Sequence, residues 1–290
     1  MDQETGLALS TLLISIARGA APLLFAAMGG LLSERSGVIQ IALEGMMLMG
    51  ALFAAITSYF TGSPWLGFAA GSLAGLIMAG LKSFFVLKLR TDQIVTGTAI
   101  NILAVGIAPF ITKILFQSTG STPNLPIEAR FVYAPLVISF LLSGGLMYWF
   151  SQTRSSLWVQ FAGEAPQALQ ASGISVGKVR LFSLLTCGLF AGMGGATLSL
   201  CLASAYSPNM TAGRGFMALA ALIFGRWRPL PTFFACLLFA LTDAIQIRLQ
   251  GATTGIPVQF IQILPYLITI IALAGFFGRS QAPKGLGQHI

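Results

Sequence analysis

Charged side chains inside long apolar runs are the first candidates for chemistry in this sequence. Glu34 and Arg35 are adjacent, and Glu44 follows ten residues later, just inside the next apolar run. A charge near the centre of a membrane costs about 2.5–3.5 kcal/mol, so such groups usually face a partner or a watery cavity. We therefore hold two interpretations of this cluster. It is either a broken helix exposing helix ends to a central pathway, or an ordinary cytoplasmic turn with Glu44 salt-bridged to another helix. On the first interpretation the pathway residues are Glu34, Ser36, Gln40 and Glu44.

Two further clusters place polar groups where apolar runs begin. Asp92 can accept from the free N–H groups of a helix start, and Thr96 and Thr98 can bond back to carbonyls of their own helix. Asn101 has no local partner, so it either faces a pathway or bonds to another helix; Thr96 is the second pathway candidate here. Arg214, between two glycines, either meets a polar ligand together with a helix N-terminus or extends to the membrane surface.

Two more ionisable residues, Arg18 and Asp243, also lie within apolar runs. An ion pair between them, or of either with Glu44, is an open alternative.

No catalytic or metal-binding motif accompanies these residues. The sequence has no G-x-x-x-x-G-K-[ST], H-E-x-x-H or G-x-S-x-G pattern, and its one histidine is His289. Its three cysteines stand singly in apolar runs, without metal-ligand or disulfide spacing. We predict that the chain is not an enzyme, hydrolyses no ATP itself, and carries no metal or cofactor.

The composition identifies an integral membrane protein. Lys, Arg, Asp and Glu are only 8% of the 290 residues, whereas soluble domains carry about 25%. Hydrophobic residues make up 56%, which also excludes intrinsic disorder. The net charge of +8 does not indicate nucleic acid as a partner, because that would require a polar basic face.

The apolar runs are continuous and about 20 residues long, which is the length of membrane-spanning helices and not of barrel strands. We predict an all-α polytopic membrane bundle forming one transmembrane domain over 1–290, with about nine segments (eight to ten). One of these, 214–227, is too short to span and is expected to be a broken or re-entrant half-helix. The segments are 7–32, 38–60, 64–88, 94–116, 132–150, 181–204, 214–227, 230–250 and 258–277.

Basic residues orient the bundle. With nine crossings, the end of the third segment, the loop between the fifth and sixth, and the C-terminal tail all fall on one side, and all carry Lys or Arg. We take this side as cytoplasmic and the N-terminus as external. The four-residue spacings Gly67-Gly71-Gly75 and Gly188-Gly192-Ala196 predict closely packed helix faces.

The cytoplasmic stretch 163–174 has the signals of a short helix. Glu164 precedes Pro166, which suits the first helical position, and Gly173 suits the stop. About two turns of surface helix result. It is either a lone amphipathic loop helix or a docking helix that enters a partner's groove through its small residues, Ala168, Leu169 and Ala171.

Four motifs together resemble a known family. The run GGLLSERSGVI at 29–39, followed by LEGMMLMGA at 43–51, is similar to the permease subunits of ABC importers for nucleosides and simple sugars. These belong to the ribose and branched-chain amino acid permease superfamily. The stretches 92–101, 163–174 and 213–225 resemble that family's polar helix start, coupling helix and late short helix. One departure is Gln40, where the family pattern has Asn; Ala42 replaces Gly nearby.

The resemblance implies a transport function with several partners. The chain would pair with a second permease subunit, identical or homologous, and form the translocation pathway at their interface. A separate ATP-binding cassette ATPase, carrying ATP and Mg, would dock on the coupling helix through Glu164, Pro166, Ala168, Leu169, Ala171 and Gly173. A solute-binding lipoprotein would deliver substrate from outside the cytoplasmic membrane of a prokaryotic cell. A nucleoside is the first substrate expectation and a pentose or hexose the second.

Membrane proteins of other classes are alternatives to an ABC importer subunit. An ion-coupled secondary transporter for a small polar solute would use Glu34, Glu44 or Asp243 to carry protons or bind sodium. A channel or a structural membrane scaffold is the third alternative. If Gln40 faces the solute, its longer side chain changes selectivity relative to the family pattern.

Overall fold

The chain was analysed as a computed structural model that describes residues 2–118, 120–251, 263, 267 and 282–288. In these ranges the structure is helical, with ten α-helices, two π-helical turns, one 3-10 turn and no strand. The predicted all-α class is confirmed. Seven of the described helical stretches are long and apolar enough to cross a membrane.

The helix boundaries follow the predicted segments closely. The 11-residue α9 confirms a short helix in the 214–227 segment, whereas the predicted segment 258–277 lies outside the described residues. A π-helical turn extends α3 over Phe84–Lys88 and another extends α8 over Leu198–Leu202. The α-helices are α1 Asp2–Arg35, α2 Leu43–Thr61, α3 Pro64–Ser83, α4 Gln93–Phe116, α5 Ala134–Gln152, α6 Arg154–Glu164, α7 Pro166–Ala171, α8 Val176–Thr197, α9 Arg214–Phe224 and α10 Pro229–Gly251.

The core of the bundle is built around α2. This helix is apolar on all sides and buried along most of its length, as expected for a helix enclosed by others. Helices α3, α8 and α4 pack around it, and α9 contacts both α1 and α2. By contrast, only 28% of the apolar window is buried in α4 and in the stretch that contains α5, which is the pattern of helices that face lipid.

Small residues allow α3 and α8 to approach at backbone distance, as their spacing predicted. A Cβ placed on Gly71 would lie 2.9 Å from the Cβ of Ala196, and one on Gly75 would lie 2.7 Å from the Cα of Gly192. On α2, Gly50 meets Gly192 in the same way. No side chain fits at these positions, so the contact requires glycine.

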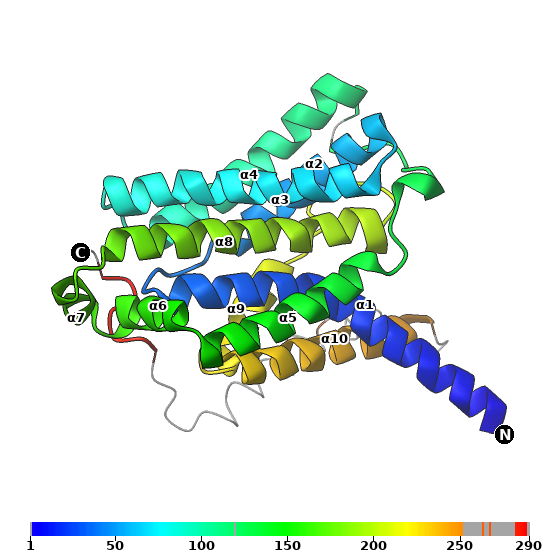
Figure 1. The fold of residues 1–290 in the computed structure, drawn as a ribbon. Helices are drawn as coiled ribbons and strands as arrows, with labels where there is room; N and C mark the ends of the chain where they lie inside the picture. Colours follow the sequence, from blue (N-terminus) through cyan, green and yellow to red (C-terminus); the bar gives the residue numbers. More distant parts are fainter. Residues whose placement is uncertain (1, 119, 252–262, 264–266, 268–281, 289–290) are drawn as a thin grey trace.

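The three basic regions meet at one end of the molecule. Helices α6 and α7 lie at this end, and the N-terminus of α1 lies at the other (Figure 1). Arg180 of α8 donates from Nη1 to the carbonyl of Gln288 in the C-terminal tail at 2.7 Å. Arg90, beyond the end of α3, borders the same cavity as Arg180. We call this the α6–α7 end; it is the end predicted to be cytoplasmic.

Candidate functional site around a broken helix

The connection between α1 and α2 is irregular and buried. Residues 36–42 form no helix, and Ser36, Val38 and Gln40 have no exposed surface. Gln40 Nε2 donates to Cys187 Sγ at 3.0 Å, and Cys187 lies about 16 Å along α8 from its first residue at 1.5 Å per residue. Irregular backbone at such depth must be enclosed in protein, because lipid offers its N–H and C=O groups no partner. We call 36–42 the broken segment.

The adjacent charges at the end of α1 take separate partners. Glu34 Oε2 accepts from the indole Nε1 of Trp227 at 2.6 Å, and its Oε1 accepts from the N–H of Gln40 at 3.2 Å. Arg35 forms an ion pair with Glu164 at 3.1 Å and donates from Nε to the carbonyl of Trp227 at 2.7 Å. The end of α1 is therefore tied both to α6 and to the chain that follows α9.

Glu44 occupies the N-terminus of the half-helix α9. Its Oε1 accepts from the N–H of Gly213 at 2.9 Å, and its Oε2 accepts from the N–H of Gly215 at 2.7 Å. Gly213 has φ of 81°, a left-handed conformation that favours glycine. A side chain at Gly215 would collide with the Glu44 backbone. The carboxylate thus satisfies free helix N–H groups where the helix dipole favours negative charge.

These contacts align two motifs that lie far apart in the sequence. Glu44 meets the start of α9, and Glu34 meets Trp227 just beyond its end. The stretch from Glu34 to Glu44 and the helix α9 therefore run antiparallel, with a hydrogen-bonded contact at each end of the pair.

Helix α4 holds the opposite side of the broken segment. Asn101 Oδ1 accepts from the N–H of Gly45 at 2.8 Å, and its Nδ2 donates to the carbonyl of Ile41 at 3.0 Å. Gln93 Oε1 accepts from the N–H of Ile39 at 2.8 Å. Asn101 therefore makes the contacts of a bond between elements, which was one of its two expected roles.

Lys82 is a residue that sequence reasoning missed. It has no exposed surface, and its Nζ donates to the carbonyl of Ile39 at 2.6 Å and to Oε1 of Gln40. In the sequence Lys82 counts only among the basic residues near the end of the third segment. Its position inside an apolar run, six residues before Lys88, was the signal available. Gln93 and Trp227 carried no comparable signal, because their partners are distant in sequence.

The side-chain amide of Gln40 contacts only other residues of this subunit among those described. Besides Lys82 and Cys187 it contacts Met46, with Nε2 to Sδ at 3.4 Å. In this conformation the side chain that departs from the family pattern is therefore packed inside the subunit.

The predicted cap at the start of α4 is confirmed. Asp92 accepts from the N–H groups of Ile94 and Val95, both at 2.9 Å. Thr96 and Thr98 bond back to carbonyls of the preceding turn, as expected. Thr96 is buried at the inner face of α4.

The remaining intramembrane charges do not pair as suggested. Among the described residues the only ion pair within 4 Å is that of Arg35 and Glu164, so the suggested pairs of Arg18, Asp243 and Glu44 are not formed. Arg18 instead donates to the carbonyl of Cys201 at 3.2 Å. Arg214 donates to the carbonyl of Met210 at 3.3 Å. Both guanidinium groups therefore donate to backbone carbonyls, although Nε of Arg18 is buried without a partner, and Glu44 accepts from the start of α9.

The short helix predicted within 163–174 is present as α7. Pro166 is in its first turn, and Gly173 follows its end with φ of 82°. Leu169 is 3% exposed and packs inward against Ala162 and Val176. The outward face of α7 is therefore formed by Gln167, Ala168, Gln170 and Ala171.

Buried irregular backbone and the N-terminus of a short helix inside the bundle occur together in transport proteins, which fits the first of the two interpretations of this cluster. The seven candidate spans make the chain a multi-pass membrane protein. Residues 12–273 match the family described as the permease component of branched-chain amino acid transport systems, and the chain belongs to it. It is a permease subunit of an ABC transporter, a membrane component without catalytic chemistry of its own. This assignment replaces the ion-coupled alternative.

Named relatives cover nearly the whole chain. The guanosine ABC transporter permease NupQ of Bacillus subtilis is 34% identical over 92% of each chain. The nucleoside permease NupC of Lactococcus lactis is 31% identical over 92% of each. TsgC13 of Haloferax volcanii, provisionally named for glucose, is 33% identical over 91% of this chain and 90% of its own. A solved ABC transporter in an inward-facing conformation shares the fold, with TM-score 0.53, 16% identity and coverage of 90% and 84%.

Proposed function

We propose that this chain forms the translocation pathway of an ABC importer for a nucleoside. One observation carries the substrate class: two relatives named for guanosine or nucleoside transport align with 92% of the chain. A simple sugar is the second candidate, supported by TsgC13. The protein would lie in the cytoplasmic membrane of a prokaryotic cell.

The site residues would act on the pathway through the broken segment. Glu34 and Asn101 bond to this segment, Gln40 ties it to Cys187 of α8, and Glu44 bonds to α9, so moving either element must break some of these bonds. Because the bonds are specific to one arrangement, a ligand or partner that favours another arrangement shifts the equilibrium between the two. Ser36, Thr96 and Arg214 complete the proposed set.

The partners would meet opposite ends of the bundle. A second permease subunit, identical or homologous, would complete the pathway. An ATPase that binds ATP and Mg²⁺ would dock on α7, where Ala168 and Ala171 are exposed and Glu164 connects to Arg35 of α1. An extracytoplasmic solute-binding lipoprotein would approach the end that bears the N-terminus. The 163–174 region would thus transmit ATPase motion directly to the end of α1.

Uptake by the assembled transporter tests both the substrate and the energy source. Cells expressing the complete complex should accumulate radiolabelled guanosine. Excess unlabelled nucleoside should compete, glucose should not, and ATP depletion should abolish accumulation while an ionophore leaves it largely intact. Competition by glucose alone would assign the transporter to sugars. Uptake that survives ATP depletion but collapses with the ion gradient would contradict the proposal.

A further inference from the structure

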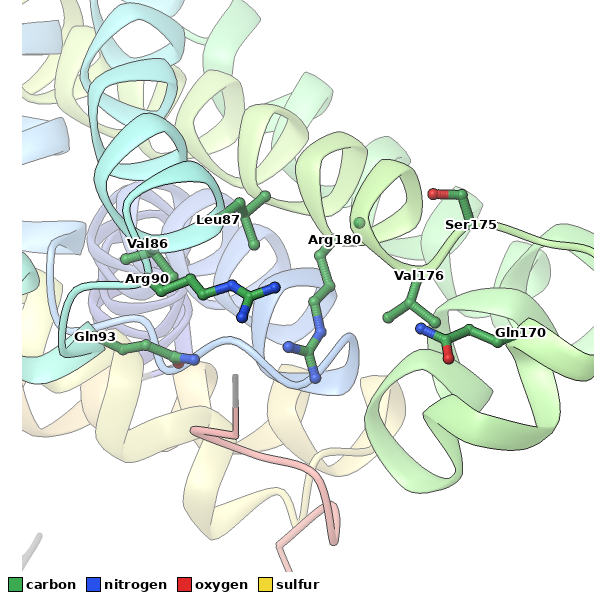
Figure 2. A pocket seen from close by; sticks show the side chains of 9 residues that line it. Val86, Leu87, Arg90, Gln93, Gln170, Ser175, Val176 and Arg180 are labelled. Carbon is green, nitrogen blue, oxygen red and sulfur yellow. The ribbon is translucent and has the colours of Figure 1, made fainter. Parts of the chain in front are cut away.

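A polar cavity that the proposed pathway does not use lies at the α6–α7 end. Its volume is about 340 Å³, and it is bordered by the end of α3 with its π-helical turn, the start of α4, α7 and the start of α8 (Figure 2). Val86, Leu87 and Val176 supply apolar walls. The polar lining consists of Arg90, Gln93, Gln170, Ser175 and Arg180.

Arg180 brings to this cavity a buried charge whose hydrogen-bond partners are neutral. It is 3% exposed, its Nε and Nη1 donate to the carbonyls of Ser36 at 3.1 Å and Gln288 at 2.7 Å, and its Nη2 lies at 3.4–3.5 Å from the carbonyls of Gly285 and Ala162. No described carboxylate lies within 4 Å of it. A buried charge without an opposite charge is costly, so an anion in the adjacent cavity would stabilise this arrangement.

A second guanidinium faces the first. Arg90 extends across the cavity toward Arg180 (Figure 2), and it forms no ion pair with any described residue. The acid nearest in sequence, Asp92, is engaged in capping α4. Two like charges directed at one space repel each other unless an anion lies between them.

The start of α8 adds backbone N–H donors that suit an anion. This 22-residue helix begins at Val176, and the side chain of Ser175 does not cap it. The first N–H groups of a helix have no acceptor within the helix, and the dipole there favours an anion. Ser175, Val176 and Gly177 all border the cavity.

We propose that this cavity binds a phosphate group, with Arg90 and the start of α8 contacting its oxygens and Arg180 supplying charge from the buried side. Guanidinium groups match phosphate oxygens in geometry and charge. The phosphate can be the headgroup of an inner-leaflet phospholipid or free inorganic phosphate, because both present the same oxygens. Once bound, it would tie the α3–α4 connection to α7 and α8. This inference does not depend on the transported solute.

Inorganic phosphate binding to the full-length chain, purified with any subunits that accompany it, tests the proposal. Arg90→Gln should weaken phosphate binding at least about tenfold, the loss expected for a charge-assisted contact. Arg154→Gln is the matched control, because Arg154 is an exposed arginine at the same end but outside the cavity. It should leave the dissociation constant within about twofold, as expected for a surface charge. Since Arg90 is itself exposed, unfolding temperatures without phosphate should match in all three proteins.

Lipid binding separates the two sources of phosphate. Native mass spectrometry would count lipids retained from nanodiscs of phosphatidylcholine with and without phosphatidylglycerol. Phosphatidylglycerol retained by the native chain and lost in Arg90→Gln identifies a headgroup site, whereas binding of inorganic phosphate alone identifies a free-anion site. Either supports the proposal. Binding of neither probe, or equal loss in Arg154→Gln, overturns it.

Discussion

At the scale of single residues, Glu44 joins two helices through both of its carboxylate oxygens. Its two carboxylate oxygens accept from Gly213 and Gly215, whose N–H groups have no other helical acceptor. The carboxylate therefore fills the place that a bound anion takes at other helix N-termini. It joins α2 to α9 through charge-assisted bonds, and any change that separates these helices must release it.

Glu44→Gln should weaken this junction. The amide keeps one acceptor oxygen but turns an NH₂ group toward a backbone N–H, so one bond is lost and the charge with it. We expect the free energy of unfolding to fall by about 1–3 kcal/mol, with uptake reduced more than subunit assembly. Thermal unfolding of the purified protein and uptake in cells measure the two effects. Glu128→Gln is the control, because Glu128 is exposed in a connecting turn; equal behaviour of the two variants would contradict the assigned role.

At the scale of elements, α7 is a short helix with two distinct faces. Leu169 anchors it to Ala162 and Val176, while Ala168 and Ala171 face outward. Leu169 thus packs α7 against α6 and the start of α8. The ion pair from Glu164 to Arg35 connects α6 to α1.

Cysteine crosslinking can determine which face of α7 meets the ATPase. Ala168→Cys and Ala171→Cys should form disulfide or short bifunctional crosslinks to an ATPase subunit during turnover, because both positions are exposed. Leu169→Cys is the matched control on the same helix and should not crosslink, because that side chain points into the subunit. Gel mobility and mass spectrometry detect the products. Crosslinks from position 169 with none from 168 or 171 would show that α7 does not dock in the proposed orientation.

At the scale of the whole molecule, sequence predicted the elements better than their contacts. Apolar runs, Pro166, Gly173 and the Asp92 cap are local signals, and the structure confirms the helices they predicted. The partners of Glu44 on α9 and the indole that contacts Glu34 lie 169 to 193 residues away. No local pattern encodes which helix N-terminus a carboxylate will meet. The sequence therefore identified the polar clusters of the site but could not predict which of them contact each other.

The same reasoning explains which predictions about pairing failed. Arg18 and Asp243 were considered as ion-pair partners because both are charges in apolar runs. A guanidinium can instead donate to a carbonyl at a helix end, as Nη2 of Arg18 does to Cys201. Lys82 is satisfied likewise by Ile39. Where irregular backbone is enclosed in a membrane bundle, its carbonyls compete with carboxylates for every nearby cation.

The subunit has no visible energy source of its own, so we predict that it cannot drive transport alone. Two of its membrane acids, Glu34 and Glu44, are held by internal donors, and the sequence has no nucleotide-binding loop. A conformational equilibrium without an energy source can only let solute run down its gradient. Vesicles containing this chain alone should therefore show no accumulation of labelled guanosine, with or without ATP or an ion gradient. Vesicles containing the complete complex should accumulate guanosine when ATP and the solute-binding protein are supplied. Accumulation by the isolated chain would mean that Glu34 or Glu44 couples transport to ions, and Glu44→Gln would then be the first variant to test for loss of that coupling.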